Sequence, residues 1–219
     1  KAAPAAAAEA RLAAQQAREQ RDAERRQQQA KTAEQARRWW AAAGAADPSH
    51  PYLTKKHLAP HGLRQRDSML LVPLYFDGEL VNLERIFPDG AKRPLFGGRA
   101  KGVAGLVGKL AGVERVLIAE GWATAAALHE AMALPVVVAR NADNLEAVAR
   151  RLCQRLPDNV AITIAADDDR FTEGNPGATK ARLAALAIGA KVLMPTFCAD
   201  CQRCTDFADV ALCRKERGL

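Results

Sequence analysis

Two acidic clusters follow short apolar runs, and each cluster stands where a buried strand is expected to end. The first run, residues 116–119, leads into Glu120-Gly121, and the second, residues 160–166, leads into Asp167-Asp168-Asp169. Apolar, partly β-branched runs of this length are typical of buried parallel strands. Ligands of open α/β sheets bind outside the carboxyl ends of the strands. Carboxylates at those ends can therefore hold a divalent metal ion, and such ions commonly bind phosphates.

The second cluster has a spacing that suits a metal ion. Asp167 and Asp169 are two residues apart, so their side chains lie on the same face of an extended segment. Asp168 points to the other face and is the least expected ligand of the three. Three adjacent carboxylates also repel one another unless a cation intervenes. The alternative interpretation is an acidic turn that caps the next helix.

The elements that must position these carboxylates alternate between strand and helix from residue 113 onward. Strands are expected at 115–119, 135–139, 160–165 and 191–194, and helices at 123–132, 145–156 and 178–188. This alternation predicts an α/β fold with a mostly parallel sheet flanked by helices.

A small basic region, residues 45–112, precedes this sheet. Strands at 69–76 and 79–87 are joined by Asp77-Gly78, a strong hairpin signal, and Asp89-Gly90 indicates another tight turn. The loop at 92–102 combines glycines, which let a backbone approach a ligand, with basic side chains suited to phosphate. It is a candidate site for nucleotide or template, and a flexible basic surface loop is the alternative. The candidate residues are Arg85, Lys92, Arg99 and Lys101.

The N-terminal segment, residues 1–44, is rich in Ala, Arg, Gln and Glu, which favours one long helix. Large apolar side chains are nearly absent before Trp39, so we expect a solvated linker helix, with a partner-binding coil as the alternative. The chain is thus expected to divide into this helix, an α+β subdomain at 45–112 and a catalytic domain at 113–219. It begins with Lys1 rather than Met, and we interpret it as part of a longer protein.

The order of the two acidic motifs at successive strand ends resembles the Toprim domain, which bacterial-type primases, topoisomerases and some nucleases share. Segments 118–126, 136–139, 165–169 and 173–177 are similar to the Toprim primases of plasmids, phages and integrative elements. The resemblance implies a Toprim-type sheet behind a small basic subdomain, with Mg²⁺ or Mn²⁺ as cofactor. One departure is Thr124, where replicative primases often have Asp.

This resemblance also implies roles for single residues. Glu120, Asp167 and Asp169 match the catalytic, metal-binding carboxylates. Asp206 and Asp209 resemble the last acidic motif of the family, and either could instead cap a helix. Asn141 follows the 135–139 strand, and Lys180 lies beyond the Gly174–177 turn, which could hold phosphate at a helix start. These two are candidates for nucleotide or DNA binding, and plain turns explain their positions as well.

Four of the five cysteines are close in sequence. Cys198, Cys201 and Cys204 have the spacing C-x2-C-x2-C, and Cys213 follows. The spacing suits zinc and is compatible with an iron–sulfur site. The resemblance predicts neither, so reduced thiols without metal are the expected state and zinc is the alternative. An odd cysteine count without secretory features indicates a reducing, cytoplasmic setting.

The overall charge narrows the class of partner. A formal charge of +7 and a pI of about 9.4 favour a polyanionic partner, with nucleic acid ahead of a membrane surface. No run approaches the roughly 20 apolar residues of a membrane span.

We therefore predict a DNA primase fragment that joins ribonucleoside triphosphates into RNA primers on single-stranded DNA for mobile-element replication, with a replicative helicase as a further partner. A metal-dependent Toprim nuclease is one alternative, because the same carboxylates could activate water. The other is a non-catalytic module that binds single-stranded DNA or a replication protein. Metal binding that depends on Asp167 and Asp169 would separate the enzymes from the binding module.

Overall fold

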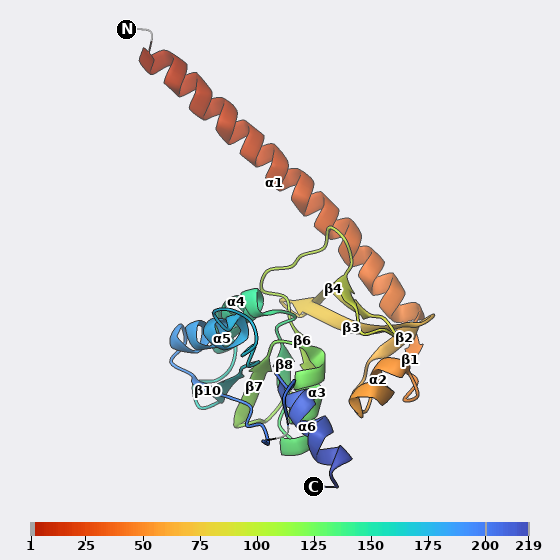
Figure 1. Cartoon of the computed structure of the whole chain (residues 1–219). Coiled ribbons are helices and arrows are strands. Elements are labelled where there is room, and N and C mark those ends of the chain that lie inside the picture. The colour runs from red at the N-terminus through yellow and green to blue at the C-terminus, as the bar shows by residue number, and fades with distance from the viewer. Residues whose placement is uncertain (1–2, 200, 219) are drawn as a thin grey trace.

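The computed structural model describes residues 3–199 and 201–218, which form a long N-terminal helix and two five-stranded sheets (Figure 1). The first sheet has the order β1-β2-β3-β4-β5 and is antiparallel throughout. Its strands are β1 (Gly44–Ala45), β2 (Arg64–Arg66), β3 (Met69–Phe76), β4 (Glu79–Ile86) and β5 (Lys92–Pro94). A short helix, α2 (Pro51–Lys56), precedes β2.

The central hairpin of this sheet forms as its sequence predicts. Asp77 and Gly78 both have positive φ angles, 54° and 81°, which a tight turn between twisted strands requires. The Asp89-Gly90 turn also forms, and the Gly90 N–H donates to the Phe87 carbonyl at 2.9 Å. Strands β1, β2 and β5 were not predicted, because none has more than three residues.

The second sheet has the order β10-β9-β7-β8-β6, in which only β6 is antiparallel to its neighbour. Its strands are β6 (Gly105–Val107), β7 (Arg115–Ala119), β8 (Val136–Val138), β9 (Ala161–Ala165) and β10 (Lys191–Leu193). The predicted mostly parallel sheet is confirmed. The antiparallel edge strand β6 was not predicted from the sequence, and it lies in the glycine-rich stretch before β7.

Helices cover both faces of the second sheet. They are α3 (Trp122–Met132), α4 (Leu145–Cys153), α5 (Pro176–Leu186) and α6 (Phe207–Glu216), with a 3₁₀ turn η1 (Ala142–Asn144) before α4. Side chains alternate between the two faces, as in any strand. Leu117 packs in the core beneath α3, whereas Val116 and Ile118 pack in the core beneath α4 and α5.

The core beneath α3 continues into the first sheet. It includes Leu70 and Ile86 from that sheet, and the fully buried Trp122, whose ring lies 6.4 Å from that of Tyr52 on α2. A backbone bridge between Tyr75 and Ala104 joins β3 to the segment before β6. This shared core fixes the basic first sheet against the second sheet.

Helix α1 (Ala3–Ala42) projects from the body, and only its last turns meet the first sheet (Figure 1). Ala33 and Ala36 are buried there, and the cluster around Ala36 includes Leu71 and Leu83. The expectation of a helix solvated along its length is therefore wrong for these turns. Small alanine side chains allow close approach to the sheet, which a count of large apolar residues could not reveal.

No helix within the described residues is sufficiently long and apolar for a membrane crossing. The domain boundaries predicted at residues 44 and 112 stay a prediction.

Candidate active site at the carboxyl ends of the parallel strands

Strand pairing brings the two acidic motifs together. β7 and β9 are parallel neighbours, and Ala119 at the end of β7 pairs with Ala165 at the end of β9. Glu120 and Asp167 follow these residues and so emerge at the same edge of the sheet. This is the edge at which ligands of open α/β sheets bind.

A third acidic segment reaches this edge from α6. Asp206 caps α6, with its side chain accepting a hydrogen bond from the Asp209 N–H at 2.8 Å. Its carboxylate is close enough to Asp167 to raise the pKa of that group. We call Glu120, Asp167, Asp169 and Asp206 the acidic edge.

Full ionisation of the four carboxylates of the acidic edge is electrostatically unfavourable. Burial, followed by the charges of Glu120 and Asp206, raises the pKa of Asp167 to about 8. Burial and then Asp169 raise the pKa of Glu120, and burial also raises that of Asp206. Like charges in a desolvated site oppose ionisation, and a bound cation would relieve this opposition.

The start of α5 holds Asp169 in place. The Gly177 N–H donates to Asp169 Oδ2 at 2.8 Å. A Cβ at Gly177 would lie 2.7 Å from the Asp167 carbonyl and 2.8 Å from Asp169 Oδ2, so this approach requires glycine. Asp168 is engaged elsewhere, since its Oδ1 accepts from Asn175 Nδ2 at 2.6 Å. These contacts leave Asp167 and Asp169 facing the other carboxylates.

Thr124, in the first turn of α3, contacts the acidic edge directly. Its hydroxyl donates to Asp167 Oδ1 at 3.3 Å. Where replicative primases often carry a further carboxylate, this chain thus adds a hydrogen-bond donor and no charge.

Asp209 differs from the acidic edge because both its oxygens have partners. Lys56 Nζ lies 3.0 Å from Oδ1, and the Thr205 N–H donates to Oδ2 at 2.9 Å. Burial raises the pKa of Asp209, but these two partners outweigh it and hold the pKa below its ordinary value. Asp209 therefore fastens α6 to α2.

Lys92 is the predicted basic residue that the structure brings to the acidic edge. Its Nζ lies 3.4 Å from where a Cβ on Gly121 would be. Its positive charge also opposes the rise in the pKa of Glu120 and of Asp206. The first sheet thus places the positively charged Lys92 side chain near the carboxylates of the second sheet.

Two other predicted basic residues contact the first sheet instead, and Lys101 is exposed. Arg85 donates to the carbonyls of Arg93 and Pro94 at 3.3 and 3.0 Å. The guanidinium of Arg99 stacks 3.2 Å from the centre of the Phe76 ring, and its Nε donates to the Lys101 carbonyl at 3.3 Å.

Lys180 and Asn141 lie around the rim of the acidic edge. Lys180 Nζ pairs with Asp143 Oδ1 at 3.0 Å, and Asp143 in turn raises the pKa of Glu120. The Asn141 side chain accepts from the Asn144 N–H at 3.1 Å and so caps η1. Their predicted roles in nucleotide or DNA binding stay predictions.

Three further residues support the site, and the sequence marked two of them only by their place in a turn. Asn144, in the polar turn after the 135–139 strand, is buried and bridges the Gly102 N–H at 2.7 Å to the Val103 and Ala139 carbonyls at 2.8 Å. Gly177 belongs to the Gly174–177 turn considered for phosphate, and its hydrogen bond to Asp169 was not predicted. Lys56 was missed, because it stands in a generally basic stretch and nothing in the sequence marks it as the partner of Asp209.

Glu84 on β4 is a buried acid between the two sheets that the sequence analysis also missed. Burial raises its pKa against the opposing charges of Lys92 and Arg140. Its Oε2 and Arg140 Nε are buried atoms without a hydrogen-bond partner within residues 3–199 and 201–218. Nothing in the sequence of this strand indicated that the side chain of Glu84 faces inward.

The cysteines near the C-terminus come together in space. The thiols of Cys198, Cys201 and Cys213 all lie within 4.8 Å of one another. Cys153 lies apart at the end of α4.

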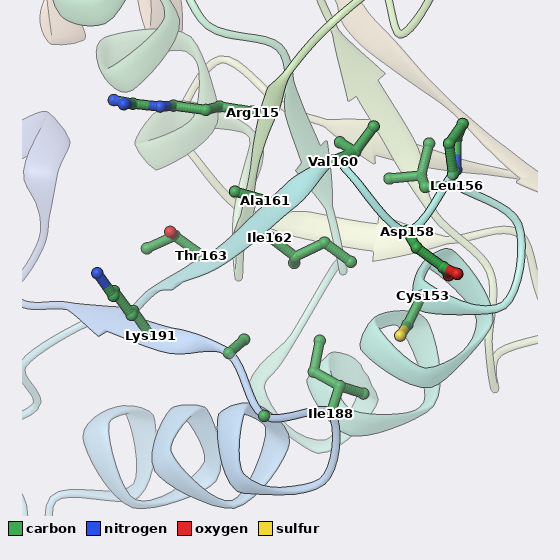
Figure 2. A pocket seen from close by; sticks show the side chains of 13 residues that line it. Arg115, Cys153, Leu156, Asp158, Val160, Ala161, Ile162, Thr163, Ile188 and Lys191 are labelled. Carbon is green, nitrogen blue, oxygen red and sulfur yellow. The ribbon is translucent and has the colours of Figure 1, made fainter.

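A hollow of about 590 Å³ opens at the opposite edge of the second sheet (Figure 2). Arg115, Val160 and Lys191 line it at the amino ends of their strands, with Ile162 and Ile188 as apolar lining. None of the four carboxylates contributes to it. We place the candidate site at the acidic edge, because that edge gathers groups able to bind a cation.

Comparison with known proteins finds similarity in the region that carries the acidic edge. Residues 115–216 match the model of the Toprim domain. Two Escherichia coli proteins called DNA primase TraC are 39% identical to this chain over 158 residues and 41% identical over 128 residues. These matches cover 67% and 55% of this chain but only 15% and 9% of the two relatives, so the chain spans a small part of their length.

Two solved structures share the fold. One contains the primase domains of two gp4 subunits of bacteriophage T7, with an RNA/DNA hybrid and dTTP. Its TM-score is 0.55 at 16% identity, and the match covers 80% of this chain and 88% of that one. The other is the catalytic domain of the DnaG primase bound to single-stranded DNA, with a TM-score of 0.52 at 14% identity, covering 90% and 78%.

Proposed function

Residues 115–216 of this chain belong to the Toprim domain family, and we propose that they form the catalytic centre of a DNA primase. The reaction is the joining of ribonucleoside triphosphates into short primers on single-stranded DNA of a mobile element. The observation that carries this proposal is the acidic edge with Lys92 beside it. The similarity to the TraC primases supports the choice of primase among Toprim activities.

The donor set of the acidic edge fits Mg²⁺ or Mn²⁺. Both ions prefer oxygen ligands, and Mg²⁺ commonly binds one or two carboxylates together with substrate phosphates. Glu120, Asp167, Asp169 and Asp206 would hold the metal, which neutralises charge on the reacting phosphate and polarises its oxygens when bound. Asp209 would not be a ligand, because Lys56 and Thr205 already occupy its oxygens.

The protein's own groups prepare this site. Thr124 and Gly177 fix the directions of Asp167 and Asp169 through hydrogen bonds. Lys92 supplies a cation from the first sheet, suited to a nucleotide phosphate that approaches the carboxylates. The Asn144 bridges hold the 101–103 segment against the end of β8, so the basic loop keeps a defined position beside the site.

Nucleic acid would reach this site across a positively charged surface. The net charge of +7 favours a polyanion. Arg85, Arg99 and Lys101 are the proposed contacts in the first sheet and its loop, and Lys180 and Asn141 are those on the rim. A replicative helicase is a further proposed partner of the longer protein.

The decisive experiment is primer synthesis on mixed-sequence single-stranded DNA with labelled ribonucleotides and either Mg²⁺ or Mn²⁺. We expect short RNA products from the wild-type protein and none from Asp167→Ala/Asp169→Ala. The matched control is Glu114→Ala/Asp158→Ala, which removes the same charge from two exposed positions outside the acidic edge. This control should retain primer synthesis.

Two other outcomes would replace the proposal. If the wild type degrades the template without making primers, the protein is a nuclease that uses the same carboxylates with water as nucleophile. If it does neither, and both double variants bind DNA as the wild type does, the domain is a non-catalytic binding module.

A further inference from the structure

Four cysteines converge near the C-terminus from two different segments. Cys198, Cys201 and Cys204 lie in the segment between β10 and α6, and Cys213 lies on α6 itself. The Cys201 Sγ is 3.1 Å from that of Cys198 and 3.0 Å from that of Cys213, and Cys198 and Cys213 are 3.6 Å apart. Cys204 lines a hollow together with Cys201 and Cys213. We call these four residues the cysteine cluster.

The geometry points to a structural zinc site in the cysteine cluster, a second metal centre distinct from the acidic edge. Four thiolates at about 2.3 Å from a tetrahedral zinc ion lie about 3.8 Å from one another. The separations of 3.0 to 3.6 Å among Cys198, Cys201 and Cys213 need only a slight expansion to reach that value, and Cys204 is the proposed fourth ligand. The C-x2-C spacing also matches that of structural zinc sites.

Other states of the cluster fit less well. Within the described residues, no disulfide joins any two of the five cysteines. Pairing any two of the three closest would leave the third thiol against the new bond. An iron–sulfur cluster inserts several irons and sulfides between its cysteines, so it needs sulfurs more widely spread than a 4.8 Å group around one ion. Thiolates are also soft ligands, which favour zinc over Mg²⁺.

A zinc ion would stabilise the loop between β10 and α6 together with α6 itself. Ala208 is the only fully buried residue in α6 within the described chain, and Phe207 and Ala211 are partly buried against the same core. Small folding units with little core are commonly stabilised by a metal ion whose binding energy contributes to folding. A closed site of four protein ligands would fasten the loop after β10 to α6.

The zinc site would also position one wall of the acidic edge. Arg170 donates to the Cys201 carbonyl at 2.6 Å, and the Asp168 N–H donates to the Thr205 carbonyl at 2.7 Å. The cysteine cluster is therefore tied to the segment that carries Asp167 and Asp169, and Cys204 lies two residues before Asp206. Zinc here would act as a positioning element and would take no part in phosphate chemistry.

The first test is metal content, which needs no enzymatic activity and so stands or falls apart from the proposed primase function. The protein is purified under reducing conditions, incubated with zinc, passed through gel filtration and measured by mass spectrometry of the metal. Wild type and Cys153→Ser should each retain a single zinc ion per chain. Cys201→Ser and Cys213→Ser should lose it. Cys153→Ser is the matched control, because this exposed cysteine lies outside the cluster.

Cobalt substitution tests the ligands directly. Cobalt in place of zinc should give the intense visible and near-ultraviolet absorption of a tetrahedral thiolate site in wild type and Cys153→Ser. Cobalt spectra without thiolate bands would overturn the proposal. So would a wild type that holds no zinc, zinc retained equally by Cys201→Ser, or iron and sulfide in place of zinc.

Removal of zinc from the wild type covers the case in which the cysteine variants fail to fold. After treatment with a chelator, backbone amides of α6 should exchange hydrogen at least about tenfold faster, and zinc alone should restore their protection. Unchanged exchange in α6 on removal of bound zinc would contradict the positioning role.

Discussion

The acidic edge and the cysteine cluster are two candidate metal centres built by opposite means. The acidic edge rests mainly on the ends of two paired strands in the core of the second sheet, and burial, followed by the charges of its other carboxylates, raises the pKa of Asp167. The cysteine cluster rests on a loop and the last helix, and of its four residues only Cys201 is buried. The acidic edge therefore has its charged groups on neighbouring core strands, whereas the proposed zinc site would join a loop to the last helix.

The largest effect is expected when a carboxylate of the acidic edge is replaced, and it should fall on catalysis. Asp167→Asn keeps the shape of the side chain but removes a charge that metal binding uses. Primer synthesis should fall by at least about a hundredfold. Zinc content should stay unchanged, because the cysteine cluster binds its ion with other residues. Metal analysis of the same sample tests this separation, and equal loss of both properties would contradict it.

The same variant should be more stable than the wild type when metal is removed. The pKa of Asp167 is about 8 in the folded protein and ordinarily 3.8, so between these values the folded state binds a proton that the unfolded state releases. Wild-type stability therefore falls as the pH rises through this window. Asp167→Asn should abolish that contribution and gain on the order of 1–3 kcal/mol at about pH 8.

Urea unfolding in the presence of a chelator at about pH 5 and about pH 8 measures this difference. The wild type and Asp167→Asn should differ more at the higher pH. The prediction is contradicted if both proteins lose the same stability between the two pH values.

Gly177→Ala should disturb the acidic edge through the backbone. The added Cβ would lie 2.7 Å from the Asp167 carbonyl, so the start of α5 must move away. We expect a loss of about 1–3 kcal/mol in the free energy of unfolding, with reduced primer synthesis. Gly44→Ala is the control, because a Cβ there meets nothing within 4 Å and its φ is not positive. Similar stability of the two variants would show that the contact can relax.

Lys56→Met examines the connection between the two centres. Lys56 fastens Asp209 to α2, and the side chains of this pair are 24% and 22% exposed. Loss of the pair should cost about 1–2 kcal/mol. The effect should be larger after zinc is removed, because α6 would then have neither tie. Chemical unfolding with and without zinc tests this, with the exposed neighbour Lys55→Met as control. Identical losses in both states would argue against a shared role.

The smallest effect on stability is expected at the rim. Lys180 and Asp143 form a pair whose side chains are 45% and 81% exposed, so Lys180→Gln should change stability by less than about 0.5 kcal/mol. If Lys180 contacts nucleotide, KM should rise about threefold with kcat little changed. Initial rates at varied nucleotide concentration test this against Lys191→Gln, an exposed lysine on the far strand β10. An unchanged KM would limit Lys180 to its ion pair.

The second sheet was largely predictable because its signals are local. The apolar runs at 116–119 and 160–166 identified β7 and β9, and the alternation with helical segments gave the parallel order. The positions of Glu120, Asp167 and Asp169 at strand ends followed directly. The short strands β1, β2, β5 and β6 were missed, since three residues or fewer carry almost no periodic signal.

The supporting contacts were not predictable, because they join segments far apart in the chain. Lys56 meets Asp209 across 153 positions, and Thr124 meets Asp167 across 43. Such pairs depend on how the first sheet and α6 pack on the second sheet. The burial of Ala33 and Ala36 depends on the same packing, as does the approach of Lys92 to the carboxylates.

The sequence by itself determined which residue types could bind metal and which strands carry the first two acidic motifs, because strand periodicity and motif spacing are properties of neighbouring residues. Only the tertiary structure decided that Asp206 joins the acidic edge while Asp209 pairs with Lys56, and that the thiols of Cys198, Cys201 and Cys213 meet between a loop and a helix. Those outcomes follow from long-range packing, which sets distances between side chains that spacing along the chain leaves open.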